Sequence, residues 1–277
     1  LTHGQAQSIL ILVGIAIAIS IQIFVGLLID SLQRTMVDRT IGNSPHMAIS
    51  SSTDVLTIRR WPQIIYEVEH IQQIKALSPS ATGNAVVEKG NSNLPVLVRG
   101  FPFSTADQIY NIGNAIYDGK EYRSRGEVLI GRELWEELEL DVGDKIVLTI
   151  PHSSTVMLTV SGIYDLGMTS INKTWLFTSL DTAQEIFGFG GRITSIEMTV
   201  EDVFQADTIA SQLEQQLNNH DLVIENWKDQ NEELLSGLEG QRVSSTIIQI
   251  VIIASVVIAI ASVLAISVLQ KSPEIGI

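Results

Sequence analysis

The sequence contains no cysteine and few aromatic residues. Aromatic residues make up 6% of its 277 positions. The absence of cysteine excludes a cysteine nucleophile. It is compatible with an oxidising compartment, where stray thiols are a liability, although many cytosolic proteins also lack cysteine. Low-complexity tracts and tandem repeats are absent too. Because 45% of the residues are hydrophobic, the chain can fold, and its length suits one large or two modest domains.

Sequence motifs for catalysis, ATP binding and metal binding are missing as well. The chain has no G-x-S-x-G elbow, no G-x-x-x-x-G-K-[ST] loop and no H-E-x-x-H helix. The histidines are scattered, and we interpret them as single surface residues: His3, His46, His70, His152 and His220. The sequence therefore predicts neither an enzyme nor a bound cofactor or metal in this chain.

Two local clusters resemble ligand sites only in composition. Gly188–Gly191 (GFGG) has the glycine content of a phosphate-binding loop but lacks its lysine, so we interpret it as a turn between a helix and a strand. The acidic residues between Glu133 and Asp144 do not have the spacing of a calcium-binding loop. We expect most of them to lie on the solvated face of a helix.

Basic residues are scarce relative to acidic ones. The sequence has 17 Lys and Arg against 31 Asp and Glu, a formal net charge of -14. Residues 30–245 hold all but one of the acidic side chains and all but one of the basic ones. This segment must lie in water, and its negative charge repels phosphates, so no nucleic-acid partner is predicted.

Two long uncharged runs flank this segment. Ile9–Ile29 and Thr246–Leu269 both exceed the roughly 18 residues above which an apolar run predicts a membrane helix rather than a buried core helix. A cleaved signal peptide is the alternative for the first run, but its apolar part would be about 7–15 residues long and followed by an A-x-A site. The sequence therefore predicts two membrane helices around one large water-exposed domain.

Within that domain, strand and helix patterns alternate. The first part predicts a strand over 47–58, a helix that begins at Pro62 and carries Ile65, Val68, Ile71 and Ile74 on one face, and a hairpin of 85–88 with 94–99. Residues 100–126 are irregular apart from a short helix at 105–110, and we interpret them as a connector between two subdomains.

The second part has the clearer patterns. The expected elements are strands over 128–130, 145–150, 155–161, 174–178, 192–200 and 221–225, with helices over 132–140 and 204–218. A helical stripe that begins at Trp227 continues into the second apolar run. The fold class predicted for the domain is α+β, with two α+β subdomains.

Four segments, in order, resemble one family of ABC-transporter permeases. They are Gly42–His46 (GNSPH), Leu129–Ile150 (LIGRELWEELELDVGDKIVLTI), Val200–Val203 (VEDV) and Lys271–Ile277 (KSPEIGI). The last resembles the K-[ST]-x-E-I-[AG]-I-L pattern of the lipoprotein-releasing, macrolide-efflux (MacB-like) and cell-division (FtsX-like) permeases. The lipoprotein-releasing branch is the most similar of the three.

The resemblance implies the N-terminal half of a four-helix permease of the cell (inner) membrane. Its domain would be extracytoplasmic, and ATP hydrolysis would occur on a separate cytoplasmic ABC ATPase subunit. The other partners implied are a second permease copy or a paralogue, membrane lipid, and a lipoprotein or amphiphilic substrate. ATP-driven dimer closure would move the stalks and shift the outer domains, which requires a rigid helix from Trp227 to Leu269.

The expected organisation follows from the two runs and the resemblance together. It is membrane helix 1–29, stalk 30–45, extracytoplasmic domain 46–225, stalk helix 226–245, membrane helix 246–269 and the start of a cytoplasmic coupling segment, 270–277. Because the chain begins with Leu1 and stops shortly after the second run, we expect it to be a fragment.

By position in the family pattern, Lys271, Glu274 and Gly276 are the candidate residues for contact with the ATPase. Lys271 also suits a simpler role as a headgroup anchor of the helix. Pro273 departs from the family's basic or polar residue and is expected to begin a new helix. One branch of the family docks a carrier through a long loop between paired strands. Only Pro151–Ser154 stand at that place here, so such docking is not expected.

Two alternative functions remain open from the sequence. One is an ATP-driven regulator of an extracytoplasmic cell-wall hydrolase, in which the same motion activates an enzyme. The other is a two-helix membrane sensor, in which a ligand-binding domain lies between membrane helices.

Overall fold

The computed structural model describes residues 3–42, 44–53, 56–89, 92–151 and 155–275. It consists of two compact units. The first combines the two ends of the chain, Leu1–Thr40 and Asn231–Ile277, and the second is the domain Ile41–Gln230.

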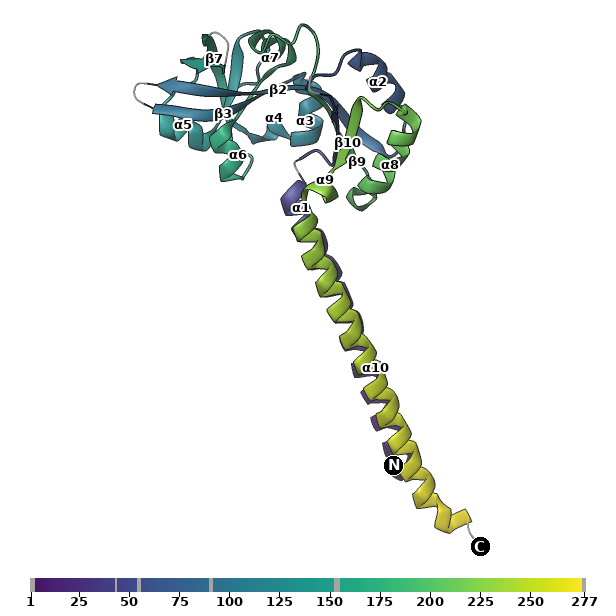
Figure 1. The fold of residues 1–277 in the computed structure, drawn as a ribbon. Coiled ribbons are helices and arrows are strands. Elements are labelled where there is room, and N and C mark those ends of the chain that lie inside the picture. The colour runs from purple at the N-terminus through teal and green to yellow at the C-terminus, as the bar shows by residue number, and fades with distance from the viewer. Residues whose placement is uncertain (1–2, 43, 54–55, 90–91, 152–154, 276–277) are drawn as a thin grey trace. The chain divides into compact units, whose positions relative to one another are not determined.

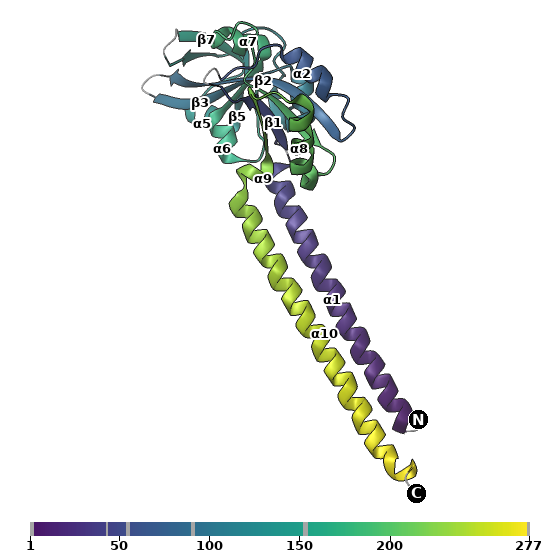
Figure 2. The ribbon, with the colours of Figure 1, turned by 45° about the vertical axis from the view of Figure 1, so that its right-hand side comes forward.

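Two long helices form the first unit, and they run side by side (Figure 2). They are α1 (His3–Ile41) and α10 (Glu232–Ile275). Leu12–Val37 and Leu235–Ile266 are long and apolar enough to cross a membrane, and neither is buried inside the protein. Large apolar side chains are exposed along both segments, which is the surface that a lipid environment favours.

A single mixed sheet builds the second unit (Figure 1). Along its main path the strand order is β10-β1-β9-β2-β3-β8-β5-β7-β4, and β6 pairs with β2 and β7. The pairs β3/β8 and β5/β7 are parallel, and the other pairs are antiparallel. The strands are β1 (Met47–Ser51), β2 (Ile74–Lys89), β3 (Ser92–Phe101), β4 (Ile116–Gly119), β5 (Glu127–Gly131), β6 (Lys145–Thr149), β7 (Thr155–Tyr164), β8 (Trp175–Ser179), β9 (Ser195–Val200) and β10 (Leu222–Asn226).

Short helices pack against this sheet. α3 contacts β2, α7 contacts β2 and β3, and α8 contacts β10. The helices are α2 (Trp61–Val68), α3 (Phe103–Tyr110), α4 (Ile112–Ala115), α5 (Arg132–Leu138), α6 (Thr169–Thr174), α7 (Leu180–Ile186), the 3-10 turn η1 (Val203–Gln205), α8 (Ala206–Leu217) and α9 (Trp227–Gln230).

The part of the sheet around β5 has a core on each face. Val128 and Ile130 belong to an aliphatic cluster, whereas Leu129 between them belongs to a cluster rich in aromatic rings. Because neighbouring strand residues point to opposite faces, the two clusters cover the two sides of the sheet. The aromatic cluster includes Phe101, Tyr110, Tyr122, Tyr164 and Phe177.

The α+β class and most of the expected elements are confirmed. The hairpin of β2 and β3, the unit β5-α5-β6-β7, the strands β8, β9 and β10, and helix α8 all form where the residue patterns place them. The Gly188–Gly191 turn also forms, between α7 and β9. The short connection expected at 151–154 lies, apart from Pro151, outside the described residues.

The short helix expected at 105–110 forms as α3, but the interpretation of residues 100–126 as a connector between subdomains is wrong. Residues 100–126 contain α3, α4 and β4, and Phe101, Tyr110 and Tyr122 in it are buried in the aromatic core. Strand β1, the first strand of the domain, pairs with β9 and β10, which are its last two strands. The halves of the domain are therefore interleaved in sequence, because strand pairing joins residues far apart along the chain.

The ends of several elements also differ from those expected. β1 stops at Ser51, and Ile58 forms only an isolated bridge to Ile193. α2 ends at Val68, and Ile74 instead begins β2, because pairing with β9 stabilises an extended backbone there.

The helix expected from Trp227 to Leu269 is interrupted. α9 ends at Gln230, and α10 begins at Glu232. The Asn226 side chain stabilises α9 as a separate turn, because it donates to Asp229 and accepts from the Lys228 N–H. In addition, α10 runs through Pro273 to Ile275, so no new helix begins at that proline.

Candidate functional site: a junction where the chain enters and leaves the domain

His46 lies just before the first strand of the domain and Trp227 just after its last strand, and a hydrogen bond joins the two residues. The Trp227 N–H donates to the His46 carbonyl over 2.9 Å, and the His46 N–H donates to the Met198 carbonyl over 2.8 Å. Pairing of β1 with β10, which places Met47 opposite Asn226, brings these segments together. We call His46, Val203, Asp207, Trp227 and Lys228 the junction.

The His46 side chain adds a second bond to the same strand. Its Nδ1 accepts a hydrogen bond from the Val200 N–H over 3.0 Å, so this nitrogen carries no proton. Burial lowers the pKa of His46 below its ordinary value, and the charge of Lys75 lowers that pKa further. The interpretation of His46 as a surface residue holds only in part, because its side chain is half-buried and bonded to β9. His70 and His220 are exposed, as expected.

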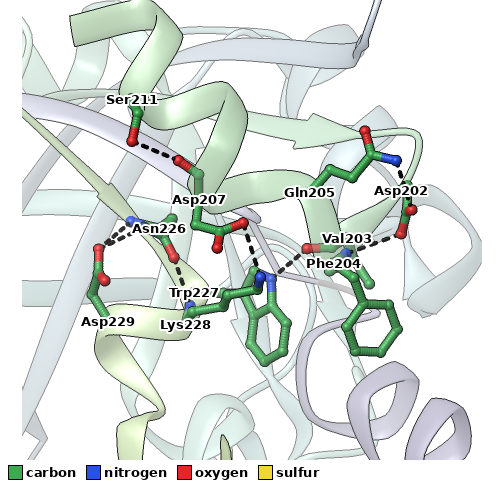
Figure 3. A network of polar contacts seen from close by, with 10 residues as sticks. All are labelled: Asp202, Val203, Phe204, Gln205, Asp207, Ser211, Asn226, Trp227, Lys228 and Asp229. Atoms are coloured by element: carbon green, nitrogen blue, oxygen red, sulfur yellow. Dashed lines mark hydrogen bonds and ion pairs between the residues drawn. The ribbon is translucent and has the colours of Figure 1, made fainter.

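Trp227 is the buried centre of the junction (Figure 3). Its side chain is 2% exposed, and its indole N–H donates to the Val203 carbonyl over 2.7 Å. The ring meets the Phe204 ring edge-on, with 6.1 Å between the centroids. The apolar ring thus fills a core position while its one polar atom is satisfied, as a buried tryptophan requires.

An ion pair connects the residue after Trp227 to helix α8 (Figure 3). Lys228 Nζ lies 2.8 Å from Asp207 Oδ1. Burial alone would raise the pKa of Asp207, but the hydrogen bond and charge of Lys228 outweigh it and hold that pKa below its usual range. Asn226 completes the contact: its Oδ1 accepts from the Lys228 N–H over 2.9 Å, and its Nδ2 donates to Asp229 over 2.6 Å.

The polar groups of the junction make structural contacts. They are engaged with one another, so they fix the leaving segment to β1, to the turn after β9 and to α8. Within the described residues, no group of three or more histidine, aspartate or glutamate side chains could hold a metal ion.

None of the three residues that the sequence predicts to contact an ATPase belongs to the junction. Lys271 and Glu274 belong to the C-terminal end of α10, and Gly276 lies outside the described residues. Their contact with an ATPase stays a prediction. Sequence reasoning missed the junction because its partners come from β1, β9, η1, α8 and α9, and no local pattern links them. The one available signal was the position of His46 and Trp227 at the domain boundaries.

Comparison with known proteins agrees with this fold. Residues 8–216 match the family model described as the MacB-like periplasmic core domain. The periplasmic region of MacB from Actinobacillus actinomycetemcomitans has a similar fold, with a TM-score of 0.51 at 13% identity, covering 72% of this chain and 95% of that one.

Two curated relatives are similar over nearly the whole chain. The lipoprotein-releasing system transmembrane protein LolE of Haemophilus influenzae is 25% identical over 96% of this chain and 67% of its own length. LolC of Xylella fastidiosa, of the same system, is 23% identical over 96% of this chain and 66% of its own length. The chain thus spans about two thirds of each relative. With the family model matched over most of its length, the chain belongs to the MacB-like periplasmic core domain family.

Proposed function

We propose that this chain is part of an ABC-transporter permease in which ATP-driven motion of membrane helices is transmitted to the domain through the junction. The family, the two helices suited to a membrane and the likeness to lipoprotein-releasing transmembrane proteins support this role. The observation that carries the transmission step is the pair of bonds made by Trp227, from its main chain to His46 and from its indole to Val203.

The junction suits transmission because it involves both ends of the domain. Only a few residues separate His46 from α1 and Trp227 from α10. Main-chain hydrogen bonds connect Trp227 to His46 and His46 to β9, so we expect a displacement of either end to reach β1 and β9. Because the helix expected to be rigid from Trp227 to Leu269 is interrupted at Asn231, the proposed transmission depends on the hydrogen bonds of the junction rather than on one continuous helix.

The remaining parts of the proposal follow the family. The chain lies in the inner membrane through 1–29 and 246–269, with stalks 30–45 and 226–245 and a periplasmic domain 46–225. A separate cytoplasmic ATPase contacts the segment 270–277 at Lys271, Glu274 and Gly276. A second permease copy or paralogue completes the assembly, and the substrate is a lipoprotein or another amphiphile.

Affinity purification of the full-length protein from its native membrane tests the ATPase contact. We expect a separate protein with a Walker A motif to copurify, and the reversal Lys271→Glu with Glu274→Lys to reduce its recovery several-fold. The reversal Lys173→Glu in the domain is the control and should not change recovery. Absence of any nucleotide-binding protein from the wild-type preparation would refute the permease assignment.

Transport by the reconstituted complex tests the junction. Lys228→Met removes the ion pair with Asp207, and Lys173→Met removes an ion pair of similar length, 2.9 Å to Glu137, far from the junction in sequence. We expect only Lys228→Met to lower the amount of substrate moved per ATP hydrolysed, with basal ATP hydrolysis unchanged. Equal coupling in the two variants would contradict a transmitting role for this contact.

A further inference from the structure

A pocket between α2 and the turn before β9 has three arginines in its wall. Its volume is about 640 Å³, and its lining consists of Arg59, Arg60, Trp61, Pro62 and the turn Phe189–Arg192. The two segments are far apart in sequence. The Ile58–Ile193 bridge joins them, with N–H to carbonyl distances of 2.6 and 3.3 Å.

The pocket is positively charged in an otherwise acidic protein. None of its lining residues is acidic. Among the described residues, no carboxylate forms an ion pair with Arg59, Arg60 or Arg192. Several other arginines of the domain do form ion pairs: Arg99, Arg123, Arg125 and Arg132. Arg192 Nε donates to the Phe189 carbonyl over 2.8 Å, which positions its guanidinium and leaves its terminal N–H groups for a ligand.

The pocket wall also contains two aromatic residues, Trp61 and Phe189. The Trp61 indole N–H donates to the Gly191 carbonyl over 3.0 Å, so the ring is fixed between the two segments. Phe189 stacks on Phe187, with 5.4 Å between centroids and 26° between planes. Both Trp61 and Phe189 are only half-buried, so part of each ring is open to a ligand.

The backbone of this pocket is held in an unusual conformation. Arg60 has a φ of 54°, in the left-handed region that non-glycine residues seldom adopt, and Gly190 and Gly191 have φ values of 59° and 79°. This backbone conformation sets the points at which the side chains of Arg59 and Arg60, both exposed, leave the main chain.

We infer that this pocket binds a small organic anion, a phosphate or carboxylate joined to a short apolar group. Arginine forks pair with the two oxygens of such a group, and the aromatic rings contact its apolar part. The volume lies in the range of about 300–1,000 Å³ that is typical of small-molecule sites. A lipid headgroup and a free metabolite both have this chemistry. The site goes beyond the permease role and does not depend on an ATPase.

Calorimetric titration of the full chain in nanodiscs of neutral phosphatidylcholine tests the inference. The test ligands are water-soluble dibutyroyl phosphatidylglycerol, phenyl phosphate and inorganic phosphate. We expect one of the two organic anions to bind at least about tenfold more tightly than inorganic phosphate. Tighter binding of phosphatidylglycerol would identify a headgroup site, and tighter binding of phenyl phosphate a site for a free anion.

A matched pair of variants isolates the pocket. Arg59→Gln with Arg60→Gln should weaken binding about tenfold or more, since charge-assisted hydrogen bonds are lost. Arg123→Gln with Arg125→Gln removes the same charge from exposed arginines elsewhere and should leave binding unchanged. Thermal melting checks that both variants fold. Equal binding of inorganic phosphate, no binding of any ligand, or the same loss in both variants would overturn the inference.

Discussion

Among the ion pairs of the described residues, Arg99 and Glu197 form the one that is shielded most completely from water. Their side chains are 8% and 6% exposed, and the Tyr110 hydroxyl donates to the same carboxylate. The Arg99 guanidinium also lies over the Trp175 ring, 4.2 Å from its centroid. Burial raises the pKa of Tyr110 well above its ordinary value, so its hydroxyl stays protonated and continues to donate.

Removing one charge of this pair should be more harmful than removing both. We expect Glu197→Gln to lower the free energy of unfolding by about 3–5 kcal/mol, because it leaves Arg99 buried and unpaired. The double variant Arg99→Met with Glu197→Met should recover part of that loss. Urea unfolding followed by tryptophan fluorescence measures both. A Glu197→Gln protein as stable as the wild type would show that the pair is not shielded as the structure describes.

His46 gives the domain a dependence on pH. Its pKa in the folded state lies below the ordinary value of 6.5, because burial penalises the imidazolium. Between these two pKa values the unfolded chain binds a proton that the folded chain excludes. Stability contributed by His46 is therefore complete above pH 6.5 and falls as the pH is lowered through the folded-state pKa.

The variant His46→Asn tests this assignment. Its amide oxygen can still accept the Val200 N–H bond, but the side chain no longer titrates. We expect the difference in melting temperature between wild type and variant to change between pH 7 and pH 5, with the wild type losing more. A constant difference across this interval would contradict the burial of a neutral imidazole.

At the level of elements, the contact between β5 and α6 depends on a glycine. A Cβ added at Gly131 would lie 2.0 Å from the Asn172 carbonyl oxygen, which is a main-chain atom. Asn172 is also fixed through its side chain, which accepts from the Leu166 N–H over 3.0 Å and donates to Asp165 over 2.8 Å. These bonds fix Asn172 to the segment before α6, so its main chain cannot easily move away from a side chain placed at position 131.

Gly131→Ala should accordingly destabilise the domain by at least about 1–3 kcal/mol, the usual cost of overpacking. The control is Gly240→Ala in α10, where an added Cβ meets no described atom within 4 Å. That substitution is expected to be neutral or to stabilise the helix by about 0.5–1 kcal/mol, because alanine favours helix over glycine. Circular dichroism melting curves separate the two results, and equal melting temperatures would contradict the close approach.

At the level of the whole molecule, these 277 residues contain no cysteine, so single cysteines introduced into them can report the topology of this chain. Single cysteines at Ser124, exposed in the domain, and at Ser272, in the proposed coupling segment, can be labelled with a membrane-impermeant maleimide. We expect Ser124→Cys to react in intact spheroplasts and Ser272→Cys only after permeabilisation. Labelling of both residues in intact spheroplasts would contradict the proposed arrangement across the membrane.

Local residue patterns predicted the elements whose residues are neighbours in sequence. The uncharged runs form α1 and α10, and the alternation around Leu158 forms β7, because period and composition alone determine which face each residue presents. The charge of the domain and the absence of catalytic motifs follow from the sequence in the same direct way.

Tertiary contacts decided the rest. β2 extends through Pro79 and Gly83, which a local reading treats as breaks, because β9 and β3 pair with it along its length. The segment 100–126 becomes core, and His46 meets Trp227, for the same reason: the energy comes from partners far away in the sequence. An alternating residue pattern predicts a strand but does not identify the strand that pairs with it. Which neighbour it takes, and therefore where the junction lies, is settled only by packing and pairing in three dimensions.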